Sequence, residues 1–176
     1  KWGTERKVAD TFEGYDFPII RYAEVLLNYA EAMYELGTTG KALDDALNIS
    51  LNLVRLRVNP DMPKLTTSFA SENSLNMREE IRRERTIELY NEGFRVDDLK
   101  RWNTAIVEMP KPILGVKWTG TDFATSWAGA SNMAKDSDGC LILENSRRWG
   151  SKNDLYPLPV DQCQLNPNLG QNPGWQ

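Results

Sequence analysis

The sequence predicts an all-α fold of helical hairpins that continues into a long irregular insert and ends in an extended tail. Apolar residues recur at helical spacing through much of residues 18–102, which are expected to form the scaffold. Residues 103–154 lose that spacing and are rich in Gly, Ser, Thr, Asn and Trp, which is typical of a loop-rich insert. Residues 155–176 hold several prolines and show no period, so they are expected to lie extended on the body.

Two helices are expected to open the scaffold as a hairpin. In the first, residues 18–37, Pro18 suits the first turn and Gly37 suits the C-terminal end. Apolar residues at helical spacing predict a second helix over residues 40–59, and Pro60 ends it because proline cannot continue a helix. The pair resembles a tetratricopeptide unit, in which small residues let two antiparallel helices pack closely, although the second helix is too long for a standard repeat.

The rest of the chain alternates loops and shorter elements. Residues 60–72 are interpreted as a loop, and a third helix is expected over residues 74–92, with Gly93 as its stop. A short helix follows over residues 96–102. Within the insert, the apolar run at residues 140–144 predicts a short strand.

Composition excludes several kinds of chemistry. The 176 residues include no His, which removes Ser-His-Asp catalysis and His-containing zinc sites, and no cofactor or metal centre is expected. Cys140 and Cys163 cannot build a zinc site alone; one disulfide and two free thiols both fit. The net charge of −4 argues against nucleic acid as a partner. The opening at Lys1 is typical of the middle of a protein, so a fragment is expected.

Residues 81–102 carry unusually many charges of both signs, and three interpretations compete. On the helical wheel Glu88 falls beside Ile81 in the apolar stripe, flanked by Glu84 and Arg85. A nucleic-acid surface is disfavoured because glutamates interrupt the arginines. A hydrolase using Glu84 and Glu88 is a second possibility, although neighbouring arginines should hold both ionised. The favoured interpretation is structural, with half-buried ion pairs that fix how helices dock.

Aromatic residues in the insert suggest a binding surface. Sugars offer C–H faces that stack on aromatic rings, and the insert supplies Trp118, Phe123 and Trp127, with Trp149 further along. The alternative is that these rings anchor a long irregular segment to the helices. The acidic run at residues 135–139 predicts a turn; a calcium site there would need more ligands.

Three stretches in order resemble the C-terminal part of SusD/RagB family proteins. They are RYAEVLLNYAEAMYELG, IRRERTIELYNEGFRVDDLKRW and YPLPVDQCQLNPNLGQNPGW. The resemblance covers residues 18–102 and 155–176 but not the insert. Val96 departs from the pattern, which usually has a bulky residue there, and Tyr90-Asn91 replaces the usual pair before Glu92-Gly93.

The resemblance implies a surface lipoprotein of Bacteroidetes that binds glycans and is not an enzyme. Such proteins work with a SusC-type TonB-dependent transporter, and the lipid anchor in the outer membrane would lie upstream of this chain. Residues that match the scaffold motif imply fold maintenance: Arg82, Glu84, Arg85, Glu88, Glu92, Gly93, Asp98, Arg101 and Trp102. Residues that match the tail motif are Asn166, Pro167, Asn168, Gln171, Asn172, Pro173, Gly174 and Trp175.

The favoured functional hypothesis is therefore glycan capture for nutrient uptake. Trp118, Phe123 and Trp127 are the expected ligand-binding residues, no catalytic residue is expected, and the membrane is reached only through the upstream anchor. The alternative is a tetratricopeptide-like module that binds another protein and no glycan. Hydrolysis by Glu84 and Glu88 is the third hypothesis.

Overall fold

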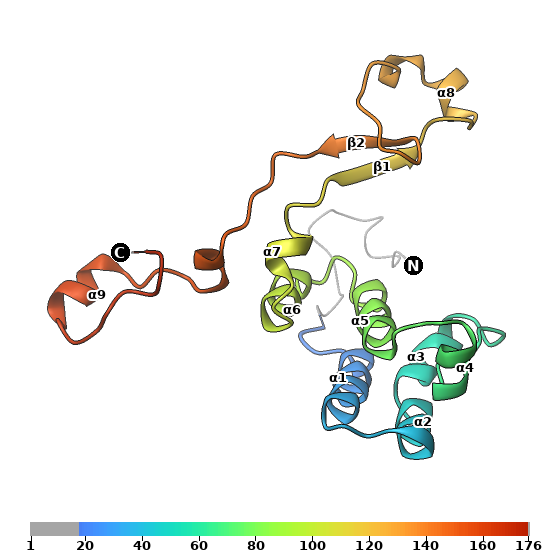
Figure 1. Cartoon of the computed structure of the whole chain (residues 1–176), viewed down its shortest axis with the longest axis horizontal. Coiled ribbons are helices and arrows are strands. Elements are labelled where there is room, and N and C mark those ends of the chain that lie inside the picture. The colour runs from blue at the N-terminus through green and yellow to red at the C-terminus, as the bar shows by residue number, and fades with distance from the viewer. Residues whose placement is uncertain (1–17, 176) are drawn as a thin grey trace, which may run out of the picture. The chain divides into compact units, whose positions relative to one another are not determined.

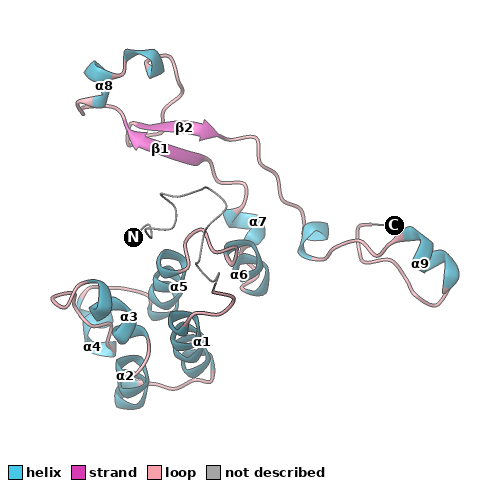
Figure 2. Ribbon diagram, turned by 180° about the vertical axis from the view of Figure 1, so that it is seen from behind, coloured by secondary structure: helices cyan, strands magenta, loops and turns pink. Residues whose placement is uncertain are grey.

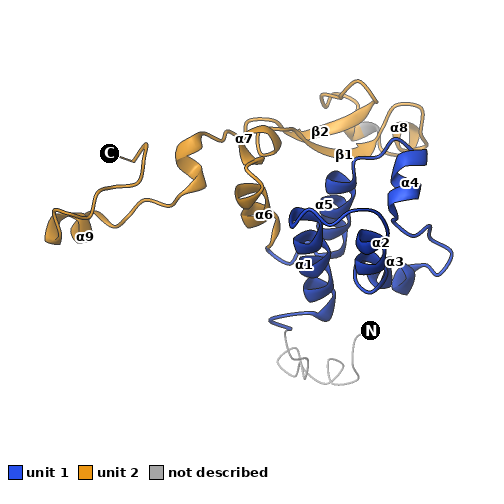
Figure 3. Cartoon of the chain, turned by 60° about the horizontal axis from the view of Figure 1, so that its bottom comes forward, with its two compact units in different colours: residues 1–93 blue, residues 94–176 orange. Residues whose placement is uncertain are grey.

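The structure, a computed structural model, describes residues 18–175 and is mostly helical, as predicted (Figures 1 and 2). The chain divides into two compact units, residues 1–93 and 94–176 (Figure 3). Among the described helices, none has the length and hydropathy that crossing a membrane would require. In its described residues, 18–93, the first unit contains helices α1 (Tyr22–Glu35), α2 (Gly40–Asn48), α3 (Leu51–Val58), α4 (Thr67–Glu72) and α5 (Met77–Glu88).

The second unit mixes short helices with a two-stranded sheet. Its elements are α6 (Arg95–Arg101), α7 (Ala105–Glu108), β1 (Ile113–Lys117), α8 (Phe123–Ser126), the 3₁₀ turn η2 (Ala128–Ala130), β2 (Cys140–Glu144), the 3₁₀ turn η3 (Ser151–Asp154) and α9 (Val160–Leu165). In the described part of the chain the strands are β1 and β2, which are drawn in magenta in Figure 2. The all-α prediction is therefore confirmed apart from this hairpin.

Helix α1 begins later than predicted and ends where predicted. Pro18 does not lie in its first turn, because the helix starts at Tyr22 and Arg21 occupies the N-cap position with extended backbone. The Arg21 side chain donates to the carboxylates of Glu88, the last residue of α5, and of Glu92 beyond that helix, so tertiary contacts hold the residue at this start. Gly37 follows the helix at φ +81°, a conformation that glycine adopts without strain, which confirms it as the stop.

The helix predicted over residues 40–59 is two helices, and the single-helix prediction is wrong. The break falls at Ser50, whose backbone leaves the helical region while its Oγ donates to the carbonyl of Ala46 at 2.6 Å. A serine that bonds back to its own helix offers the backbone an alternative to the regular ladder. Both pieces bury leucines against α1, and fully buried Leu27, Leu47 and Leu51 form the centre of this unit.

The segment predicted as a loop, residues 60–72, contains α4. Thr66 caps it by accepting a hydrogen bond from the N–H of Phe69 at 3.1 Å. Ahead of the cap, the fully buried Asn52 side chain accepts from the Leu65 N–H at 2.8 Å and donates to the Leu65 carbonyl at 3.0 Å. This side chain satisfies both backbone groups of a residue outside regular structure, which fixes the connection between α3 and α4.

Helix α5 is shorter than predicted at both ends. Ser74 has φ 54° and lies outside it, and Asn76 caps it by accepting from two backbone N–H groups. The helix ends at Glu88, not at residue 91 or 92, and Asn91 adopts a left-handed φ of 63°. The helix packs against α1 and α3 and buries Ile81 toward them.

In the second unit, α6 confirms the short helix predicted near residues 96–102. Strand β2 confirms the predicted strand at 140–144, and its antiparallel partner β1 was not predicted. A Cβ on Gly115 would come within 3.2 Å of the Leu143 side chain, so a larger residue there would require that side chain to shift. The C-terminal tail is extended except for α9, which the sequence did not predict.

Candidate functional site

Glu88 lies at the centre of an ion-pair network between three helices. Its side chain is only 10% exposed, and its Oε1 accepts from Nη1 of Arg21 at 2.9 Å. Nη2 of Arg57 donates to both carboxylate oxygens, at 2.9 and 2.8 Å. Because Arg21 precedes α1 and Arg57 lies in the last turn of α3, one carboxylate of α5 joins all three elements.

Arg21 forms hydrogen bonds to a second carboxylate and to a backbone carbonyl in addition to its ion pair with Glu88. Its Nε and Nη2 donate to the two oxygens of Glu92 at 2.9 and 2.6 Å, a bidentate contact. Its Nη2 also donates to the Glu88 backbone carbonyl at 3.0 Å, which helps satisfy the open end of α5. Hydrogen bonds to Glu92 and Glu88 raise the pKa of the Arg21 guanidinium, so the cation is permanent.

Further contacts extend the network along α5. The Arg85 side chain is buried and its Nη1 donates to Oδ1 of Asn28 on α1 at 2.7 Å. Glu84 faces Arg55 of α3, with 3.7 Å between Oε2 and Nη1. At the other end of α1, Glu35 lies 3.8 Å from Nη2 of Arg82. The motif residues of α5 thus point to its neighbours within the unit, which is the arrangement that a structural role requires.

The remaining motif residues belong to the connection and to α6. Gly93 has φ +89°, where an L side chain would be strained. In α6 the buried Asp98 accepts from Nε of Arg101 at 2.9 Å, and the Arg101 guanidinium lies 4.9 Å from the ring centroid of Trp102. These contacts are local to the second unit and are compatible with the same structural role.

The two glutamates of the hydrolase hypothesis have different environments. Both oxygens of Glu88 accept from guanidinium groups, which leaves no lone carboxylate to take a proton from water. Burial raises the pKa of the Glu84 carboxyl above its ordinary value of 4.5, and Arg55 and Arg83 only partly oppose this. Burial is thus the largest influence on the Glu84 carboxyl, and the two arginines offset it only in part.

The raised pKa of Glu84 predicts a pH effect on stability. Between 4.5 and its raised value the folded protein binds a proton that the unfolded chain has lost, so stability falls as pH rises through this window. The Glu84→Gln variant lacks that loss. We expect its free energy of unfolding, relative to wild type, to rise between about pH 4 and about pH 7 in urea titrations. Glu79→Gln, an exposed change on the same helix, is the control; equal pH profiles for both variants would contradict the prediction.

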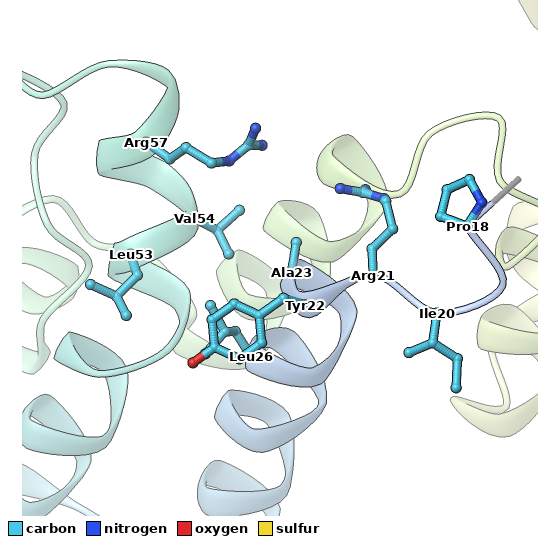
Figure 4. Close-up of a pocket in the computed structure, with 9 residues that line it drawn as sticks. All are labelled: Pro18, Ile20, Arg21, Tyr22, Ala23, Leu26, Leu53, Val54 and Arg57. Atoms are coloured by element: carbon cyan, nitrogen blue, oxygen red, sulfur yellow. The ribbon is translucent and has the colours of Figure 1, made fainter. Parts of the chain in front are cut away.

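An apolar cavity of about 530 Å³ opens between the start of α1 and α3 (Figure 4). Figure 4 shows Arg21 and Arg57 reaching toward one another at its edge, where both bind Glu88. Sequence patterns did not identify this cavity, because it depends on how two helices pack. The residues that line it are Pro18, Ile20, Arg21, Tyr22, Ala23, Leu26, Leu53, Val54 and Arg57.

The insert aromatics fall into two classes. Trp118 is only 5% exposed and forms a small core with Ala130 and Leu141. Phe123 and Trp127 lie at the start and just past the end of α8 and are 49% and 59% exposed. The structure therefore brings two of the three candidate rings to the surface of one short helix and places the third beneath them in the core of the insert.

The acidic run at residues 135–139 forms a turn, as predicted. Oδ1 of Asp136 accepts from the N–H groups of Asp138 and Cys140, at 3.0 and 2.8 Å, and Gly139 has φ +80°. Among the described residues, no three Cys, Asp or Glu side chains gather as metal ligands. Cys140 and Cys163 are both free thiols, which settles the alternative that the sequence left open.

The tail motif closes on the segment that precedes α9. The Gln171 amide donates to the Leu158 carbonyl at 2.9 Å and accepts from the Leu158 N–H at 2.7 Å. Asn172 donates to the Tyr156 carbonyl at 2.6 Å, and Trp175 Nε1 donates to the carbonyls of Lys152 and Leu155. The polar side chains of this tail thus bind backbone groups, which makes the tail a clasp for residues 152–158.

The chain matches the SusD family over residues 3–175. It is similar to a solved SusD-like carbohydrate binding protein from Bacteroides fragilis, with 31% identity and a TM-score of 0.64 over 87% of this chain and 28% of that chain. It is also similar to BT4246, with 27% identity and a TM-score of 0.66 over 92% of this chain and 24% of that chain. The chain thus spans about a quarter of the length of these relatives. No curated protein matches it.

Proposed function

Because the chain belongs to the SusD family, we propose that it is part of a glycan-binding protein that serves nutrient uptake at the cell surface. The similar protein from Bacteroides fragilis is described as carbohydrate binding, which supports this proposal. In this view the protein is not an enzyme, is held at the outer membrane by a lipid anchor, and passes oligosaccharide to a SusC-type TonB-dependent transporter.

The observation that carries the proposal is the pair of exposed rings on α8. Phe123 and Trp127 present flat apolar surface to solvent, and such surface stacks on the C–H faces of sugars. Trp118 lies in the core below them, so its role is to hold α8 in place and not to contact the ligand. A ring pair on a helix that is anchored from beneath loses little freedom when a ligand binds.

Removing either exposed ring is expected to weaken glycan binding by the full-length protein about tenfold, the cost of one stacking contact. Affinity gel electrophoresis of Phe123→Ala and Trp127→Ala against a panel of soluble polysaccharides measures this. The matched control is Tyr90→Ala, which removes a ring that is 82% exposed in the first unit. Unchanged retardation of both insert variants would contradict the proposed site.

A protein-interaction module is the second candidate, and the cavity between α1 and α3 favours it. Ile20 at its edge is 70% exposed and Leu53 is 47% exposed, which is more apolar surface than a scaffold needs. If this candidate holds, the full-length protein binds no glycan, and a protein partner is lost on Leu53→Asp but retained on Trp127→Ala.

A further inference from the structure

We propose that Lys100, Trp149 and Tyr156 form a second sugar subsite, which takes an acidic sugar unit that carries a carboxylate or sulfate. The inference rests on the proposed glycan binding and adds a ligand class to it. All three residues belong to the second unit, and none of them is among the aromatic residues of α8. Three observations carry the proposal: the position of an ammonium group, the local charge, and the way that the site is held.

The Lys100 ammonium lies against two aromatic rings. Its Nζ is 4.0 Å from the ring centroid of Tyr156 and 5.7 Å from that of Trp149. Tyr156 is 73% exposed, so most of its surface is open to a ligand. Contact with ring faces directs a cation but supplies no hydrogen-bond acceptor with full negative charge, so the three donors of the ammonium keep their capacity for an anion.

The charges around this site favour an anionic ligand. Among the described residues, no carboxylate lies within ion-pair distance of Lys100. The nearby Asp154 is engaged by the Trp149 indole, with 2.9 Å between Nε1 and Oδ1. Lys152 lies 4.8 Å from the ring centroid of Trp175, which adds a second cation to the same segment. Lys100 therefore faces aromatic rings, while the Asp154 carboxylate is bound by the indole and keeps its negative charge.

The tail clasp fixes the backbone around Tyr156. Asn172 binds the carbonyl of Tyr156, and Gln171 binds both backbone groups of Leu158, two residues further on. The Trp149 ring is oriented by its bond to Asp154. A site whose rings are fixed before the ligand arrives pays less entropy on binding. A sugar ring with a carboxylate or sulfate matches it, because the sugar stacks on Tyr156 while the anion meets Lys100.

Calorimetry on the full-length protein tests this with three probes: an oligogalacturonate, a sulfated galactan oligosaccharide and a neutral galactan oligosaccharide. Wild type is expected to bind at least one acidic probe more tightly than the neutral one, and added salt should reduce that preference. Lys100→Met, which keeps the apolar stem, is expected to weaken the acidic probe about tenfold and leave the neutral probe unchanged. The acidic probe that responds identifies the anion as carboxylate or sulfate.

Two comparisons separate this inference from the proposed function. Lys117→Met removes an exposed lysine of β1 and should change nothing. Tyr156→Ala should weaken the acidic probe as Lys100→Met does. If Trp127→Ala weakens neutral glycan while Lys100→Met leaves the preference for acidic probes unaltered, the glycan function stands and this inference is overturned. A wild-type protein with no preference for either acidic probe overturns it as well.

Discussion

Replacing Glu88 with alanine is expected to lower the free energy of unfolding by about 3 kcal/mol. The Glu88 side chain is only 10% exposed, and its carboxylate accepts hydrogen bonds from Arg21 and Arg57 at 2.8 to 2.9 Å. Its removal leaves two cations without their shared partner. The expected loss lies at the lower end of the range for broken buried pairs, because Arg57 is 60% exposed and water can hydrate it.

The comparison with Glu92 isolates the effect of position. Glu92 binds the same Arg21 but is 33% exposed, and Arg21 keeps Glu88 when Glu92 is removed. Glu92→Ala is therefore expected to cost about 1 kcal/mol or less. Urea denaturation monitored by circular dichroism measures both variants, with glycan affinity of the folded fraction as a second readout. Equal losses for the two variants, or a changed affinity in Glu88→Ala, would contradict a structural role for Glu88.

The sequence located this network on the correct helix but could not supply its partners. Helical periodicity placed Glu88 beside the buried Ile81, and the structure agrees that this carboxylate faces inward. Its partners Arg21 and Arg57 lie 67 and 31 residues away along the chain. No local pattern links positions so far apart, because they meet only after α1, α3 and α5 have packed.

The errors in the predicted elements have three different physical causes. A periodic apolar pattern runs unbroken through residues 40–59, yet Ser50 and the buried Asn52 form side-chain bonds to the backbone that the pattern does not register. In α4 and α9 the helices are only six residues long, too short for periodicity to emerge. Strand β1 is visible only through its partner, because a two-stranded pairing depends on which distant segment lies opposite.

The insert shows the same limit for a candidate site. Composition identified Trp118, Phe123 and Trp127 as one group, because all three are aromatic residues in one loop-rich segment. The antiparallel pairing of β1 with β2 places Leu141 within the insert core that covers Trp118, while α8 turns the other two rings outward. The sequence therefore predicted the three aromatic residues as one group. Packing separates them into a buried ring, Trp118, and two exposed rings, Phe123 and Trp127.

That division makes Trp118 a sharper test than either exposed ring. The Trp118→Ala change removes the largest side chain from a core whose other buried members are Ala130 and Leu141. Neighbours this small cannot fill the space, so the expected cost is about 3 kcal/mol for the ordered insert. This corresponds to about a hundredfold faster amide exchange for backbone groups of β1 and β2, measured by hydrogen exchange with mass spectrometry.

Two further variants distinguish a ring that supports the insert from a ring that contacts the sugar. Trp127→Ala removes an exposed ring, so it is expected to weaken glycan binding while the exchange rates of β1 and β2 stay at their wild-type values. Trp118→Phe keeps most of the buried volume, so the exchange rates of β1 and β2 in this variant should lie closer to wild type than those of Trp118→Ala. If Trp118→Ala abolishes glycan binding while amide exchange in the β1–β2 hairpin is unchanged, Trp118 itself contacts the sugar. That result would contradict its assignment as a core residue that does not contact the ligand.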